Sequence, residues 1–256
     1  MEIPVIFEDN HLLVVEKPPN ILSQEDKSGD LDILTLLKNK IKERDKKPGN
    51  VFLGLVHRLD RPVGGVMVFA KTSKCAKRLA EQIRERTFEK YYLAVVHGIT
   101  ERKKGILENY LLKNKRTNTV SVVDKNMKGA RKAVLDYELI DSVEKYSLIK
   151  INLHTGRPHQ IRVQFSTFGH PLYGDQRYGY EVNKSGQQIA LWSHSITCIH
   201  PVFKEKISFT SFPEKQGIWK LFNMKESGLI FTTISDDWSQ EQKNALYEKI
   251  LQIRTL

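Results

Sequence analysis

The chain has 256 residues, of which 40% are hydrophobic, and it carries a formal net charge of +11 at pH 7. This length supports one sizeable hydrophobic core, and a positive charge of this size is typical of nucleic-acid-binding proteins, although a well-solvated basic surface has the same composition. No apolar run approaches the ~18 residues that span a bilayer, and the N-terminus lacks the pattern of a secretion signal, so we expect a cytoplasmic protein without a membrane segment. A monomer is the default expectation for its oligomeric state.

Residues 11–16 predict a strand, and two stretches with apolar residues at helical spacing then predict helices. The first helix is expected to be capped by Asp30, because a carboxylate accepts from free backbone N–H groups at a helix start. The second is expected to start at Ser73, and the strand 91–96 follows it directly. The apolar faces of the two helices consist of Leu34, Leu37 and Ile41, and of Cys75, Leu79 and Ile83.

The middle of the chain predicts a β-hairpin with a basic tip. Residues 119–123 and 133–140 read as strands, and between them lies the polar, glycine-containing segment 124–129. Cations at such a tip are suited to contacts with the phosphates of a nucleic acid. The candidate nucleic-acid-binding residues in and next to this segment are Lys125, Lys128, Arg131 and Lys132.

A further strand, 146–153, precedes Pro158, which is placed to open a helix that Gly169 ends. The apolar face of this helix is formed by Ile161, Phe165 and Phe168, and the Arg162 side chain is expected to project next to that face. More strands continue to Phe212. Because strands and helices do not alternate regularly, we expect an α+β fold with a mixed, largely antiparallel sheet and flanking helices.

The tail contains a capping-box match at 239–242, before apolar residues at helical spacing. We therefore expect a main domain over residues 1–216 and a helical extension over 217–256 that docks on it.

One carboxylate, Asp60, stands between Arg58 and Arg61 in a loop just before an apolar strand. We expect it to be ionised, fixed and reachable. Taken alone, this pattern is also typical of a surface turn in which Asp60 only pairs with one of its neighbouring arginines.

Two longer motifs change that interpretation. Residues 57–71 read H-R-L-D-R-P-V-G-G-V-M-V-F-A-K, and residues 153–165 read L-H-T-G-R-P-H-Q-I-R-V-Q-F, followed by G-H-P-L-Y-G-D at 169–175. Together they resemble the RluA-type pseudouridine synthases, whose signatures run H-R-L-D-x-x-T-S-G and T-G-R-x-H-Q-I-R. Segments 9–20, 90–98 and 190–201 extend the resemblance over about residues 5–213. Val63-Gly64 replaces the usual Thr-Ser, which removes two hydroxyl groups from the loop but not the carboxylate.

The resemblance implies the pseudouridine synthase fold with a central cleft, and conversion of uridine to pseudouridine in tRNA or rRNA. Asp60 is then the catalytic residue, and Arg162 is the partner that holds it ionised through a charge-assisted, bidentate hydrogen bond. Tyr92 matches the active-site tyrosine, with a strand residue in the core as the alternative. Many relatives carry a small RNA-binding S4 module in front of the core, and we expect a member without one.

A target uridine must leave its stack to react, and Arg58 is the candidate to fill the gap, with a plain salt bridge as the alternative role. Arg157, His159 and Gln160 lie at the expected start of a helix, where backbone N–H groups favour phosphate, and a purely structural loop is the alternative for all three.

No cofactor or metal site is predicted. The histidines lack ligand spacing, Cys75 and Cys198 lie far apart, and neither a Walker A motif nor G-x-G-x-x-G occurs. Two other functions remain open: a non-catalytic RNA-binding protein, and a nucleoside or glycoside hydrolase, which typically needs a carboxylate pair such as Asp60 with Asp175.

Overall fold

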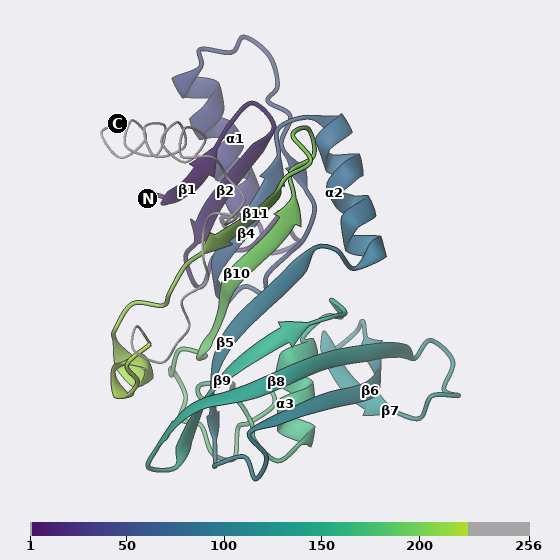
Figure 1. The fold of residues 1–256 in the computed structure, drawn as a ribbon, viewed down its shortest axis with the longest axis vertical. Helices are drawn as coiled ribbons and strands as arrows, with labels where there is room; N and C mark the ends of the chain where they lie inside the picture. Colours follow the sequence, from purple (N-terminus) through teal and green to yellow (C-terminus); the bar gives the residue numbers. More distant parts are fainter. Residues whose placement is uncertain (1, 225–256) are drawn as a thin grey trace.

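The structure is a computed structural model that describes residues 2–224, and it consists of one large sheet with helices on both faces (Figure 1). Its strands are β1 (Val5–Glu8), β2 (Leu12–Lys17), β3 (Gly54–Leu55), β4 (Gly64–Ala70), β5 (Glu89–His97), β6 (Lys104–Asn114), β7 (Thr119–Val123), β8 (Arg131–Val143), β9 (Tyr146–Leu153), β10 (Leu191–Ile199) and β11 (Lys206–Thr210). The helices are α1 (Ile33–Arg44), α2 (Ser73–Glu85), α3 (Gln160–Thr167) and the 3-10 helix η1 (Gly217–Leu221).

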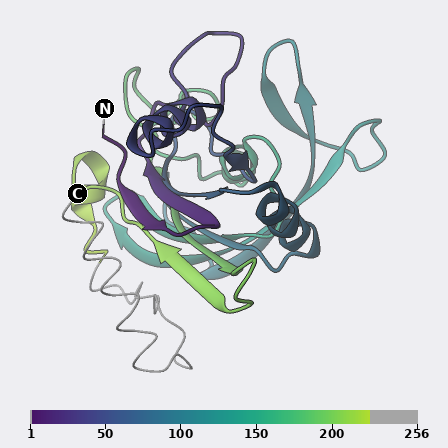
Figure 2. The same cartoon turned by 90° about the horizontal axis from the view of Figure 1, so that it is seen from above.

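The main path of the sheet runs β1-β2-β4-β10-β5-β9-β8-β6-β7, with β11 on β10 and β3 on β4. Within residues 2–224 the strand pairs are antiparallel, except for the parallel pair β4–β10. The sheet is strongly curved, and α1 lies against the β1–β2 pair (Figure 2). The predicted α+β class with a largely antiparallel sheet is therefore confirmed.

Side-chain alternation along the strands divides the core between the two faces of the sheet. Met67 and Phe69 of β4 pack in one cluster with apolar residues of α1 and α3, whereas Val66 and Val68 pack in another with α2. Tyr92 of β5 belongs to the first cluster. The α1/α3 face is thus the one on which the candidate catalytic residues meet.

Helix α1 begins later than the sequence suggested. Its N-cap is Asp32, whose carboxylate accepts from Thr35 N at 2.9 Å, and Asp30 instead forms an ion pair with Arg61 at 2.5 Å. A bridge between Leu22 and Asp32 fixes this start, so the prediction of Asp30 as the cap is wrong. Helix α2 begins at Ser73 as predicted, capped by Thr72.

The predicted hairpin between residues 119 and 140 is also wrong. Strands β7 and β8 do not pair with each other, because β6 lies between them and pairs with both. In the long β6, Tyr110 pairs with Val123 of β7 on one side and with Lys132 of β8 on the other. The segment 124–130 therefore crosses β6, and Lys132 forms an ion pair with Glu108 at 2.7 Å.

Residues 217–224, the described part of the predicted extension, pack on the sheet. Trp219, Phe222 and Met224 join a cluster with Leu93 and Trp192. The helix predicted after residue 239 lies outside the described residues, and the division at 216/217 stays a prediction. No helix within residues 2–224 is long and apolar enough to cross a membrane.

Candidate active site

The loop that carries Asp60 is fixed by contacts on both sides of the aspartate. Ser23 Oγ donates to Leu59 O at 2.7 Å and accepts from Leu59 N at 3.0 Å. Val63 N donates to Asp60 O at 3.0 Å, and Lys17 Nζ donates to Arg61 O at 3.1 Å. These bonds hold the backbone at residues 59–63, and so they fix the position from which the Asp60 side chain projects.

Lys17 is fully buried at the end of β2, and its ammonium group also donates to Pro18 O and Ile21 O, at 3.0 and 2.7 Å. Burial lowers the pKa of Lys17 to about 7, although the negative charge of Asp60 opposes the shift. Lys17 therefore braces the Asp60 loop and supplies it with a positive charge that is lost above neutral pH.

The pH dependence of stability tests this description of Lys17. Its folded-state pKa of about 7 lies below the ~10.4 of an unfolded lysine, so the unfolded chain binds more protons between these values. The free energy of unfolding should therefore rise with pH through this window, by at most about 1.4 kcal/mol per pH unit from this group. In Lys17→Met the rise should be shallower, as measured by urea unfolding at several pH values. Equal slopes in the two proteins would contradict the description.

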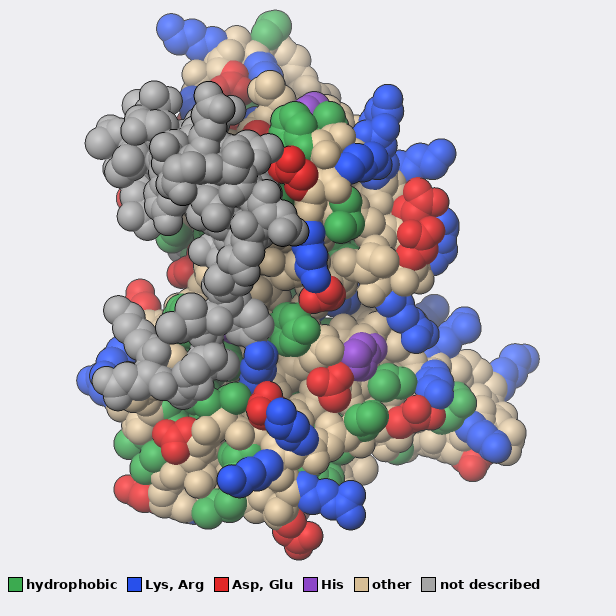
Figure 3. Space-filling view, viewed as in Figure 1, with side chains coloured by type: hydrophobic (Ala, Val, Ile, Leu, Met, Phe, Trp, Pro, Cys, Tyr) green, Lys and Arg blue, Asp and Glu red, His purple; other side chains and the backbone are tan. Residues whose placement is uncertain are grey.

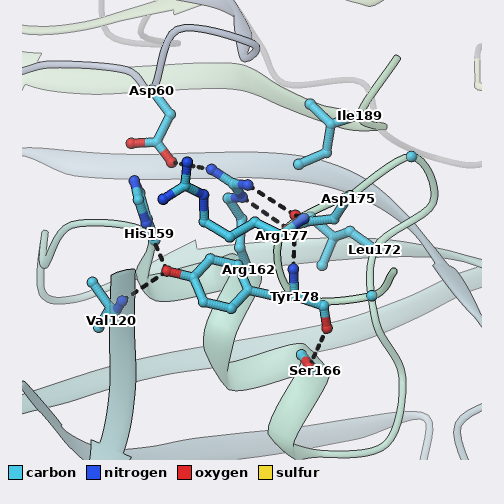
Figure 4. Close-up of polar contacts among 12 residues, drawn as sticks. Asp60, Val120, His159, Arg162, Ser166, Leu172, Asp175, Arg177, Tyr178 and Ile189 are labelled. Carbon is cyan, nitrogen blue, oxygen red and sulfur yellow. Dashed lines mark hydrogen bonds and ion pairs between the residues drawn. The ribbon is translucent and has the colours of Figure 1, made fainter. Parts of the chain in front are cut away.

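Asp60 faces α3, where Arg162 lies between two carboxylates (Figure 4). Arg162 Nη1 donates to Asp60 Oδ2 at 3.3 Å, while Nε and Nη2 donate to the two oxygens of Asp175 at 2.8 Å each. The predicted partner of Asp60 is therefore in place, but the bidentate bond is made to Asp175 and not to Asp60. Backbone N–H groups of Arg177 and Tyr178 also donate to Asp175, which fixes it further.

Arg162 is charged in this arrangement. Burial by itself would lower the pKa of Arg162, but the hydrogen bonds and charge of Asp175, followed by those of Asp60, outweigh it and raise the pKa above its ordinary value. The guanidinium group also lies over the Tyr178 ring, 5.2 Å from its centroid. A permanent, immobilised cation thus stands beside the Asp60 carboxylate.

The Asp60 side chain stays open to substrate. It is 26% exposed, and Oδ1 accepts no hydrogen bond from any residue between 2 and 224. The neighbouring arginines do not occupy it: Arg61 pairs with Asp30, and Arg58 is exposed and forms no ion pair within the described chain. The surface-turn interpretation of Asp60 is therefore wrong.

Tyr92 lies on β5 and is 6% exposed. Burial, and after it the charge of Asp60, raise the pKa of Tyr92 well above its ordinary value, although a hydrogen bond with Ser193 opposes the shift. Tyr92 is therefore a neutral phenol in the folded protein, not a phenolate.

The replacement of Thr-Ser by Val63-Gly64 has a steric reason. A Cβ at Gly64 would lie 2.3 Å from a ring atom of Trp192, and a Cβ at Gly65, whose φ is +115°, would lie 2.2 Å from Ser193 O. The indole of Trp192 fills the volume that a serine at position 64 needs. Val63 is buried, so the loop is braced by packing in place of hydroxyl groups.

The three residues predicted at the start of α3 differ in position. Gln160 is 3% exposed and bonds to Thr155, Arg157 N and Val134 O, so it braces the loop from inside. His159 is half-buried, and burial is the main cause that lowers its pKa. Its Nδ1 lies 2.7 Å from the Tyr178 hydroxyl. Arg157 is exposed and donates to Lys132 O.

Sequence reasoning missed the bracing roles of Lys17, Ser23 and Asp175. A lysine that ends an apolar strand, directly before Pro18, was the one available signal for the first. Between residues 2 and 224 no group of three or more His, Cys, Asp or Glu side chains could hold a metal ion.

Comparisons with known proteins agree on one family. Residues 11–167 match the model of the RNA pseudouridylate synthase family. The chain is 35% identical over 241 residues to an uncharacterized RNA pseudouridine synthase of Aquifex aeolicus, covering 88% of this chain and 69% of that protein. It is 31% identical to tRNA pseudouridine synthase C of Haemophilus influenzae, covering 83% and 93% of the two chains. The solved structure of human RNA Pseudouridylate Synthase Domain Containing 4 has the same fold, with a TM-score of 0.67, 21% identity and coverage of 82% and 89%.

Proposed function

The chain belongs to the RNA pseudouridylate synthase family and isomerises uridine to pseudouridine in RNA, and on that premise we propose that Asp60 carries the reaction, with Arg162 and Tyr92 beside it. We further propose that the substrate is a structured transfer or ribosomal RNA. The assignment rests on one observation. Arg162, a cation immobilised by Asp175, donates to one oxygen of the Asp60 carboxylate, whereas the other oxygen accepts no hydrogen bond within the described residues.

The reaction breaks the bond between C1′ and N1 of uridine, turns the uracil within the site and joins C5 to C1′. N1 gains a proton and C5 loses one, so no oxidant, reductant or second substrate is consumed. A carboxylate can serve this reaction as a nucleophile at the sugar or the base, or as a base at C2′. In each case Asp60 must be ionised and fixed, and the charge of Arg162 favours the ionised form.

Asp175 organises the site without reacting. Its side chain is 0% exposed, and Arg162 occupies both of its oxygens. A hydrolase of sugar bonds typically needs a second reachable carboxylate, and Asp175 does not meet that need. This burial favours an isomerase with one working carboxylate over the hydrolase alternative.

Around this centre we propose that exposed cations bind RNA. Extruding the target base from its stack costs roughly a few kcal/mol. Arg58 stands near Asp60 in the loop and carries a planar group that can stack in the place of the extruded base. Arg157, His159, Lys125, Lys128, Arg131 and Lys132 are proposed to contact the RNA further away. Cytoplasmic localisation and a monomeric state stay predictions.

Mapping of pseudouridine in total RNA, with and without the gene, tests the proposed function. At least one modified position in tRNA or rRNA should disappear without the gene and return with the wild-type protein, but not with Asp60→Asn. A pattern that is unchanged by loss of the gene would favour the non-catalytic RNA-binding protein. Free uracil released from RNA by the purified protein would favour the hydrolase.

A further inference from the structure

A basic cavity lies where α2 ends, β5 begins and β9 ends. It has a volume of about 300 Å³, and its lining includes Arg86, Phe88, Lys90 and His154. Its position follows from the topology, because β5 and β9 are neighbours in the sheet and α2 leads directly into β5. None of these residues belongs to the group of Asp60, Arg162 and Tyr92.

Lys90 is the unusual residue of this cavity. It is 8% exposed and its backbone belongs to β5, yet its ammonium group makes no hydrogen bond or ion pair in the part of the chain that the structure describes. The neighbouring Glu89 is not its partner, because Glu89 accepts from Lys206 at 3.0 Å. Burial lowers the pKa of Lys90. Buried ammonium groups are normally paired, since removing one from water without a partner is costly.

The surroundings of Lys90 add a further positive charge, and the carboxylate that lines the cavity, Glu89, pairs with Lys206. Arg86 is exposed and ends α2 in the left-handed conformation, at a φ of 63°. His154 is hydrogen-bonded to Asp136, which also accepts from Asn152. Burial, followed by the charge of Lys90, lowers the pKa of His57 to about 3, so this residue is neutral and adds no charge beside Lys90.

The cavity is close to the reaction centre. Lys90 and Tyr92 are two residues apart on β5 and lie on the same face, which places their Cα atoms about 6.7 Å apart. The Lys90 ammonium lies 3.6 Å from where a Cβ of Gly156 would be, in the loop before α3. Lys and Arg side chains gather along the right-hand edge of this face, over α2 and over the ends of β6 and β7 (Figure 3).

We propose that this cavity is a phosphate subsite, in which Lys90, with Arg86 at the rim, binds a backbone phosphate of a nucleotide that neighbours the target uridine. The proposal rests on the proposed function for the identity of the ligand, because RNA supplies the phosphate. This proposal explains why the Lys90 ammonium is buried without a partner in the protein, because the bound phosphate would accept its hydrogen bonds. The subsite would fix the RNA backbone while the uridine is turned out of its stack.

The first test compares Lys90→Met with Arg84→Gln. Arg84 also belongs to this region, but its side chain is 74% exposed and pairs with Glu81, so its variant controls for loss of one surface charge. Binding of unmodified bulk tRNA is measured across a range of salt concentrations. Lys90→Met should weaken binding about tenfold at low salt and reduce the slope of log affinity against log salt by about 0.7 to 0.9, the value for one phosphate contact. Arg84→Gln should change neither.

The second test places the phosphate. Short RNAs around the mapped uridine, each with one neutral methylphosphonate linkage, are compared for affinity. One linkage near the uridine should weaken binding to the wild type and have no further effect on Lys90→Met. Lys90→Met should also have a higher midpoint of thermal unfolding than the wild type, because it removes an unpaired buried charge, so a folding defect would not mimic the result.

An unchanged salt slope in Lys90→Met, or a linkage profile identical to that of the wild type, would overturn the phosphate subsite. These binding results do not depend on turnover. If Lys90→Met has a reduced salt slope but the wild-type protein makes no pseudouridine, the result supports the subsite and counts against the proposed function. If the wild-type protein makes pseudouridine but Lys90→Met has an unchanged salt slope, the result supports the proposed function and counts against the subsite.

Discussion

Asp60→Asn should reduce pseudouridine formation below detection while RNA binding stays within about tenfold of the wild type, or about 1.4 kcal/mol. The substitution keeps the size of the side chain but removes the negative charge that the reaction uses. Phosphate contacts by surface cations supply most of the affinity for RNA, and Asp60 makes none of them. Pseudouridine content after incubation and affinity for the same transcript are the two quantities to measure.

Asp30→Asn is the matched control for this variant. It changes an aspartate in the segment that contacts the same loop, since Asp30 pairs with Arg61, but its side chain is 45% exposed. An exposed ion pair contributes about 0–1 kcal/mol, so activity and stability should stay near those of the wild type. Equal activity in Asp60→Asn and Asp30→Asn would remove Asp60 from the mechanism.

Asp175→Asn should have the second large effect, on stability and on rate together. It leaves Arg162 buried with one long contact to Asp60 in place of a bidentate pair, and breaking a buried ion pair costs about 3–5 kcal/mol. Arg162 is then free to move toward Asp60, and a displacement of this kind near a reacting group costs about a hundredfold in rate. Chemical unfolding and single-turnover kinetics measure the two effects.

Arg162→Lys separates the charge of Arg162 from its shape. Lysine keeps one positive charge but cannot bridge both carboxylates with a planar fork, so the rate should fall and stay measurable. The expected order of rates is wild type, Arg162→Lys, then Asp60→Asn.

A rate in Asp175→Asn equal to that of the wild type would show that Arg162 needs no anchor, which would contradict the role given to Asp175.

The sequence predicted the first three helices, many of the strands and the fold class, because local periodicity indicates such elements, but it did not predict β6. The ends of elements were less certain for a physical reason. Asp30 and Asp32 are both good caps, and only the long-range bridge from Leu22 selects the second. Similarly, the pattern before and after residues 124–129 suits a hairpin, and only the position of β6 between β7 and β8 excludes it.

For the candidate site, the neighbouring arginines were misleading and the distant motif was informative. Arg61 is adjacent to Asp60 in sequence but turns toward Asp30, whereas Arg162, which is 102 residues away, contacts it. Local charge patterns could not decide between them. The anchoring of Arg162 by Asp175 and the bracing of the loop by Lys17 depend on burial, which the sequence does not specify residue by residue.

The most direct test of the central claim uses a transcript tritiated at C5 of uridine, because joining C5 to C1′ expels that hydrogen. The wild-type protein should release tritium to water without releasing free uracil, and Asp60→Asn should release none above background. Release by Asp60→Asn at the wild-type rate, or the appearance of free uracil with the wild type, would contradict an isomerase that works through Asp60.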